Sequence, residues 1–142
     1  MTRSDSRLIE AVYDALNNTE PLESAGYRIA VEEKDGVVRL SGVVRTEVHR
    51  YLAGQVAAAA VNGKRVQNDL VSDLAIAAIV AAALARDPQL APLTFRVYST
   101  LGEVRLLSPT CDPALTERAV AIAREQPGVI AVHLECPQPA VR

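Results

Sequence analysis

The side chains best suited to chemistry in this chain are two histidines and two cysteines. His49 has Glu47 and Arg50 as neighbours, but a metal site on a helix needs a second ligand three or four residues away, and Ala53 cannot supply one. We therefore interpret His49 as a solvated surface residue, and His133 in the same way. No nucleophile, base and orienting group occur together, and no phosphate-binding loop is present, so the sequence predicts neither an enzyme nor a cofactor or metal.

Cys111 and Cys136 are too few for a zinc module. Cys111 follows the second strand expected in its half of the chain, and Cys136 ends the third, so both lie at one edge of the sheet. If the first strand lies between those two strands, the cysteines are roughly 9.6 Å apart, which is too far for a disulfide without loop movement. We therefore expect two free thiols, in keeping with a reducing compartment.

A basic turn, residues 62–65 (Asn-Gly-Lys-Arg), resembles the phosphate clamp of nucleic-acid-binding KH modules, but residues 128–131 in the second half carry no charge. The chain has 15 Lys and Arg against 17 Asp and Glu, and only 4% of its residues are aromatic. Nucleic-acid binding depends on a basic excess and on rings that stack with bases. We therefore expect no nucleic-acid partner.

Arginines recur at outward positions of the expected strands, and they have two interpretations. Guanidinium groups on an open sheet face could bind lipid phosphates or the carboxylates of a partner. They could equally pair with glutamates on neighbouring strands, which is the interpretation we favour. The arginines are Arg28, Arg39, Arg96 and Arg105, and the glutamates are Glu32, Glu103 and Glu135.

The strands and helices that position these residues occur twice. Gly36, in a turn before Val37-Val38-Arg39-Leu40, corresponds to Gly102 before Glu103-Val104-Arg105-Leu106, an offset of 66 residues (102 − 36). The same offset relates four further pairs: Ile29 and Phe95, Val31 and Val97, Val56 and Ile122, Val66 and Val132. Self-similarity at one fixed offset indicates a tandem repeat. We place the first unit at residues 1–71 and the second at 72–142.

Each unit is predicted to contain a helix, two strands, a helix and a third strand, from apolar periodicity. The ranges are 6–16, 27–32, 37–44, 47–60 and 64–70, then 72–86, 93–99, 103–108, a helix after Asp112-Pro113, and 129–136. The crossover helix makes the second and third strands parallel, and we expect the third to pair antiparallel with the first. The fold class is α/β (α+β), each unit being a three-stranded mixed sheet with both helices on one face. Units this small are marginal alone, so we expect a shared interface.

The first unit resembles the BON domain, a family named for a bacterial osmotically induced protein and nodulation proteins. The resemblance rests on residues 35–44 (Asp-Gly-Val-Val-Arg-Leu-Ser-Gly-Val-Val), Arg50, Ala53, Val56-Ala57, Val66, Asn68 and Leu70. The second unit is a degenerate copy, with Ser108, Leu134 and Cys136 in place of Gly42, Asn68 and Leu70. We interpret Gly36, Gly42 and Asn68 as structural, Gly42 because no side chain fits beneath the helix.

The resemblance implies a small α/β module without catalytic residues that binds phospholipid surfaces or partner proteins. Most members are exported to the periplasm; some are cytoplasmic, including a type attached to a module that senses potassium. Here Met1 to Ser6 lead directly into a helix with no apolar signal region, and we expect a cytoplasmic protein. An export signal removed earlier would leave the same start and make the protein periplasmic.

The most informative departure from the repeat is the helix from Leu74 to Ala85, which has no polar face. Its twelve residues cannot cross about 30 Å of hydrocarbon, which takes roughly 20. A helix that is apolar all round is buried all round. We expect it to pack between the two units or in a homodimer, or else to be the adhesive surface for a membrane or a larger partner.

We predict a non-enzymatic binding module that associates with a protein partner or with its own copies, and secondarily with an anionic phospholipid surface. The candidate contact residues are Leu74, Ile76, Ile79, Val80, Arg39, Arg96 and Arg105. The alternative is a cytoplasmic sensor of a small ion or solute, of the potassium-binding BON type.

Overall fold

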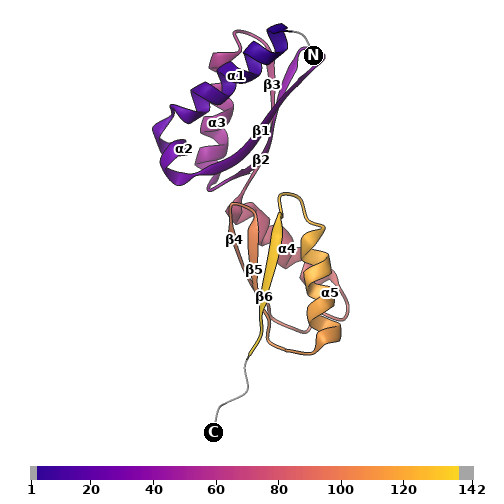
Figure 1. Ribbon diagram of the computed structural model, residues 1–142. Helices are drawn as coiled ribbons and strands as arrows, with labels where there is room; N and C mark the ends of the chain where they lie inside the picture. The colour runs from indigo at the N-terminus through magenta and orange to yellow at the C-terminus, as the bar shows by residue number, and fades with distance from the viewer. Residues whose placement is uncertain (1–2, 138–142) are drawn as a thin grey trace. The chain divides into compact units, whose positions relative to one another are not determined.

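The computed structural model describes residues 3–137, so Met1 and Thr2 of the expected start lie outside the described part. The chain divides into two units, Met1–Ser72 and Asp73–Arg142 (Figure 1). Each contains one three-stranded mixed sheet and helices on one of its faces, so the predicted fold class and the tandem repeat are confirmed.

The first unit has β2 at the centre of its sheet, antiparallel to β1 and parallel to β3. The expected pairing of the third strand with the first is wrong. The hairpin already places β1 along one edge of β2, and the crossover through α3 brings β3 to the other edge. The elements are α1 (Arg3–Asn17), α2 (Glu20–Ala25), β1 (Tyr27–Lys34), β2 (Val37–Val44), α3 (Glu47–Ala60) and β3 (Arg65–Ser72).

The core of the first unit lies between the sheet and the helices α1 and α3. Small residues on α3 let it lie close to the sheet, and the buried side chains are Val12, Leu16, Leu22, Val31, Val38, Leu40, Val44, Ala53, Ala57, Val61 and Leu70. The helix α2 lies between the first expected helix, 6–16, and the first expected strand, 27–32, where no element was predicted. Pro21 suits the first turn of a short helix, and the fully buried Leu22 fixes that helix to the core.

The second unit repeats the topology, with β5 between β4 and β6. Its strands have five residues each, whereas those of the first unit have eight. The core again lies between the sheet and two helices, and it includes Ile76, Val80, Leu84, Leu90, Val104, Leu106, Ala119 and Ala123. The elements are α4 (Asp73–Arg86), β4 (Arg96–Thr100), β5 (Glu103–Leu107), α5 (Pro113–Arg124) and β6 (Ala131–Glu135).

Gly42 lies within β2, whereas the equivalent residue of the second unit, Ser108, follows the end of β5. The φ of Gly42 is +118°, and a Cβ at this position would collide with the carbonyl oxygen of Arg28 on β1. The glycine is therefore required by a close backbone approach between two strands and not, as expected, by the helix above. With Ser108 at the equivalent position, β5 ends at Leu107, and the Ser108 hydroxyl donates to the Thr110 carbonyl at 2.7 Å.

Asp73, the first residue of α4, holds the β4–β5 hairpin. One carboxylate oxygen accepts hydrogen bonds from the Ser99 hydroxyl at 2.7 Å and the Gly102 amide at 3.1 Å. The other accepts from the Leu101 amide at 2.8 Å. Only 6% of Asp73 is exposed, so these donors replace the water that the carboxylate has lost.

The two helices of the second unit are joined by an ion pair. Arg118 on α5 places Nε 2.7 Å and Nη2 2.6 Å from the same oxygen of Asp87, which follows the end of α4. The other carboxylate oxygen accepts from the Gln89 amide at 2.9 Å. The hydrogen bonds from Arg118 are the main cause that lowers the pKa of Asp87 below its usual value.

Substituting Gly42 tests the close approach of β1 and β2. We expect Gly42→Ala to lower the free energy of unfolding by about 3 kcal/mol or more, because the new Cβ collides with backbone. Gly36→Ala is the matched control, since Gly36 also has a positive φ (+79°) but open space around its Cα. It should cost only about 1–2 kcal/mol. Urea unfolding followed by circular dichroism measures both, and equal losses would contradict the explanation.

The Asp87–Arg118 pair predicts a pH dependence for the second unit. Because the pKa of Asp87 is lowered in the folded state, its stabilising contribution is complete above the usual value of 3.8 and is lost as pH falls through the lowered pKa. The melting temperature of Asp87→Asn should therefore lie below that of the wild type at pH 7 and converge with it toward pH 2. The exposed neighbour Glu117→Gln serves as control. A constant difference between Asp87→Asn and wild type at every pH would show that the pair makes no such contribution.

Candidate functional site

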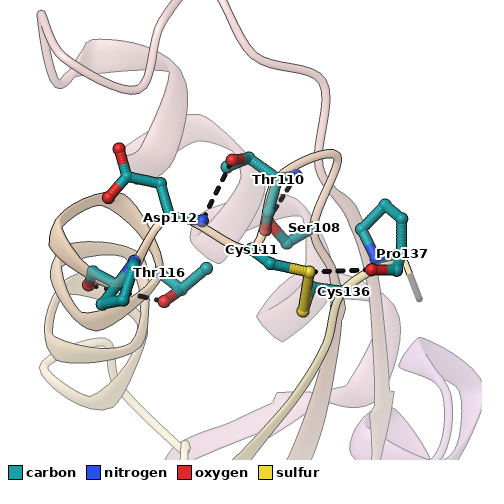
Figure 2. Close-up of a disulfide and its surroundings, with 8 residues drawn as sticks. Ser108, Thr110, Cys111, Asp112, Thr116, Cys136 and Pro137 are labelled. Atoms are coloured by element: carbon teal, nitrogen blue, oxygen red, sulfur yellow. Dashed lines mark hydrogen bonds between the residues drawn. A yellow bond between two sulfur atoms is a disulfide. The ribbon is translucent and has the colours of Figure 1, made fainter. Parts of the chain in front are cut away.

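Cys111 and Cys136 form a disulfide, with Cα atoms 5.3 Å apart (Figure 2). The expectation of two free thiols is wrong. It rested on a strand lying between the two cysteines, but β5 and β6 are neighbours, so the segments that follow them meet at one end of the sheet. The correct strand order would have made the disulfide predictable from the sequence.

The two histidines take part in local contacts. His49 lies in the first turn of α3, where its amide donates to the capping Thr46 hydroxyl and its Nδ1 lies 3.1 Å from the same oxygen. His133 Nε2 lies 3.7 Å from a carboxylate oxygen of Glu103. Within residues 3–137, no three His, Cys, Asp or Glu side chains gather in a way that could hold a metal ion.

On the sheet of the first unit, Arg39 bridges two carboxylates. Its Nε lies 2.6 Å from Asp69 Oδ2 and its Nη1 lies 3.3 Å from Glu32 Oε1. Gln67 donates a further hydrogen bond to Asp69 Oδ2 at 2.8 Å. The hydrogen bond from Arg39 is the main cause that lowers the pKa of Asp69, and the same bond raises the pKa of Arg39. Arg39 is therefore already engaged by acidic neighbours, Glu32 as the favoured interpretation predicted and Asp69, which it did not name.

On the sheet of the second unit, Arg105 lies between an acidic and an aromatic side chain. Its Nε is 3.7 Å from Glu135 Oε1, and its guanidinium carbon is 5.2 Å from the centre of the Tyr98 ring. A cation over a ring is attracted by the negative π face. Arg96 lies on β4, as Tyr98 does, and its side chain is exposed. Arg96 and Tyr98 thus give β4 a positive charge and an aromatic ring, while Arg105 already lies beside the Glu135 carboxylate.

The apolar helix α4 is not buried all round. Ile76 and Val80 are fully buried in the core of the second unit, which removes them from any binding surface, and Ile79 is half-buried. The opposite side of α4 is exposed and consists of alanines, together with Leu74, whose exposed fraction is 76%. No helix within the described residues combines the length and apolar character needed to cross a bilayer.

Leu74 borders a groove of about 460 Å³, which was not predicted from the sequence. Because β5 is central, β4 is an edge strand, and its side away from β5 carries no partner strand among the described residues. The groove follows this edge beside the start of α4, and it is lined by Asp73, Leu74, Ala77, Val97, Tyr98, Ser99 and Thr100. The strand order β4-β5-β6, with β4 at the edge, is the signal that would have predicted this groove.

Removing Arg39 tests its effect on Asp69. We expect Arg39→Gln to raise the pKa of Asp69 toward its usual value, because the strongest hydrogen bond to the carboxylate becomes neutral or is lost. Carboxyl carbon NMR titration measures this directly. Arg105→Gln in the second unit is the control and should leave the Asp69 titration unchanged. An unaltered pKa in Arg39→Gln would show that the contact is not maintained in solution.

Solved structures with a similar fold come from a secretion system. A structural protein of the type III secretion system of Chlamydia trachomatis, CdsD, aligns with 93% of this chain at a TM-score of 0.72 and 16% identity. A second structure, of the CdsD C-terminal domain, aligns with 95% at a TM-score of 0.67 and 16% identity. This chain covers 62% and 67% of those two chains. At such low identity the likeness shows a shared fold.

A search of curated proteins found no match. The sequence itself matches the model of the BON domain twice, over residues 4–71 and again over residues 72–135. These two matches correspond to the two units with the order helix, strand, strand, helix, strand described above. The chain therefore belongs to the BON domain family and carries two copies of the domain in tandem.

Proposed function

We propose that this protein is a non-enzymatic binding module that associates with protein surfaces, its own copies included, through the groove between α4 and the open edge of β4. The observation that carries the proposal is the exposure of Leu74, a large apolar side chain, beside the edge of β4 that has no partner strand among residues 3–137. Membership of the BON family supports a binding role in place of a catalytic one.

The groove offers two kinds of contact to one partner. The free edge of β4 has backbone N–H and C=O groups that can pair with an extended segment. Leu74, Ala77 and Val97 line the same groove with apolar surface, which suits one or two apolar side chains of that segment. Arg96 and Tyr98 on β4 add a positive charge and a ring that favour an acidic residue nearby.

We further propose that the protein works in an oxidising compartment such as the periplasm, and not in the cytoplasm. The Cys111–Cys136 disulfide supports this, because such bonds persist in oxidising compartments and are rare where thiols are kept reduced. The expectation of a cytoplasmic protein rested partly on free thiols, which the structure does not contain.

An anionic phospholipid surface is the second candidate, and the observation that favours it is the exposed Arg96. Against it, Arg39 and Arg105 already lie beside carboxylates, and the formal net charge is −2. A net negative chain is not drawn to an anionic bilayer at long range. We therefore rank a protein partner first. The alternative of a potassium-type sensor gains no support from a particular contact among the described residues.

A charge placed in the groove tests the proposal. We expect Leu74→Glu to weaken association of the protein with itself at least 10-fold, because a carboxylate would be desolvated in an apolar contact. Light scattering across a concentration series measures the effect. Val48→Glu is the matched control, since Val48 on α3 is similarly exposed, at 73%, but lies in the other unit. Equal effects of both variants, or a wild type that stays monomeric throughout, would contradict self-association through this groove.

The same proteins distinguish the other candidates. Co-sedimentation with vesicles containing anionic phospholipid, lost in Arg96→Gln and unaffected by Leu74→Glu, would favour the lipid surface over a protein partner. A rise in melting temperature in potassium but not sodium at equal ionic strength would favour the ion sensor. Neither result is expected from the groove.

A further inference from the structure

The last strand of the first unit is held by a hydrogen-bonded clamp between β3 and α3, formed by Arg50 and Asn68. The Asn68 amide donates to the Arg50 carbonyl at 2.8 Å, and its oxygen accepts from the Leu70 amide at 3.2 Å. In return, Arg50 Nε donates to the Leu70 carbonyl at 2.9 Å. Gly54 leaves room for this clamp, since a Cβ there would lie 2.8 Å from Asn68 Nδ2. The end of β3 is thereby tied to the start of the crossover helix.

The second unit has lost every member of this clamp. At the offset of 66 residues, Arg50, Gly54 and Asn68 correspond to Thr116, Val120 and Leu134. These replacements are consistent with one another, because an apolar Leu134 needs no polar partner and Val120 fills the space that Gly54 leaves open. Within residues 3–137, the end of β6 therefore has no counterpart of the Arg50 and Asn68 hydrogen bonds that tie Leu70 to α3.

In the second unit, the Cys111–Cys136 disulfide lies close to the position that corresponds to the clamp. Cys136 corresponds to Leu70, the residue whose carbonyl Arg50 binds, and Cys111 corresponds to Arg45, just before the crossover helix. The disulfide therefore ties the end of the last strand to the segment leading into α5 (Figure 2). In both units the end of the last strand is tied close to the start of the crossover helix, by hydrogen bonds to Arg50 within α3 in the first and by a disulfide to Cys111 just before α5 in the second.

The last strand of the second unit is also held by a shorter backbone ladder than the last strand of the first unit. The strands of the second unit are five residues long instead of eight, so β6 makes fewer backbone hydrogen bonds to β5. The disulfide encloses α5 and β6 within one loop, with a sequence separation of 25. Closing a loop of this length restricts the unfolded chain enough to shift a folding equilibrium on the order of 100-fold.

We infer that the Cys111–Cys136 disulfide replaces the Arg50–Asn68 clamp, so that the second unit, unlike the first, keeps its α5–β6 segment firmly folded only in an oxidising environment. The tandem protein thus contains one unit whose fold is indifferent to redox conditions and one whose fold depends on them. This inference does not depend on what the groove beside β4 binds.

The chemistry needs only a small-molecule disulfide such as oxidised glutathione. One cysteine thiolate attacks it to form a mixed disulfide and releases one small thiol. The second cysteine thiolate then displaces the other small thiol and closes the Cys111–Cys136 bond. Two protein thiols are oxidised and one small disulfide is reduced to two thiols, with two protons passing from the cysteines to the released thiolates. Reduction is the reverse.

Hydrogen exchange of the full-length protein, with and without a phosphine reductant, tests the inference. We expect reduction to speed exchange of the β6 amides on the order of 100-fold while the amides of β3 are unchanged. Cys111→Ser/Cys136→Ser should behave like the reduced wild type and should not respond to reductant. Restored protection after reoxidation with oxidised glutathione would exclude irreversible damage as the cause.

A matched variant in the other unit completes the comparison. Asn68→Ala removes the clamp and should speed exchange of β3 amides without affecting β6, whether or not reductant is present. If the double serine variant does not fold, reversible reduction of the wild type still decides the question. Unchanged β6 protection after complete reduction, verified by thiol titration, would overturn the inference, as would equal loosening of both units.

Discussion

Backbone pairing along both sides of one central strand is the constraint on which the rest of each unit depends. The hairpin supplies an antiparallel neighbour to β2 or β5, and the crossover helix supplies a parallel one. With both edges of the central strand occupied, β1, β3, β4 and β6 are left as the edges of the two sheets. The position of the exposed groove and the proximity of Cys111 to Cys136 both follow from that order.

The two units satisfy the same constraint with different chemistry. In the first, Gly42 permits a close strand approach, and the Arg50–Asn68 clamp secures the last strand. In the second, Ser108 follows the end of β5, and a disulfide lies near the position that the clamp occupies in the first. After duplication the two units can diverge in this respect, because each needs only one way of securing its last strand.

Apart from α2, the order of elements, the repeat and the family were predictable from sequence, because they depend on apolar periodicity and on turn residues that act locally. The outward pairing of Arg39 with Glu32 and of Arg105 with Glu135 was predictable for the same reason. Strand order was not, since the same pattern of apolar residues allows the third strand to lie on either side. The errors on the cysteines and the missed groove both came from that one choice.

Other features could not be predicted because they depend on distances between segments far apart in the chain. The three hydrogen bonds that Asp73 accepts from the hairpin and the ion pair of Asp87 with Arg118 join residues 26 to 31 positions apart. The burial of Ile76 and Val80 against the exposure of Leu74 likewise reflects which side of a uniformly apolar helix meets the sheet.

The brevity of β4 limits the length of any segment that could pair with its open edge. Five residues at about 3.3 Å each span roughly 16 Å, which is enough for a short segment with two or three side chains facing the groove. A longer, flatter edge would serve as a template for unlimited stacking of chains into fibrils. At the proposed groove, the five residues of β4 would therefore match a compact ligand and are too short a template for extended stacking at this edge.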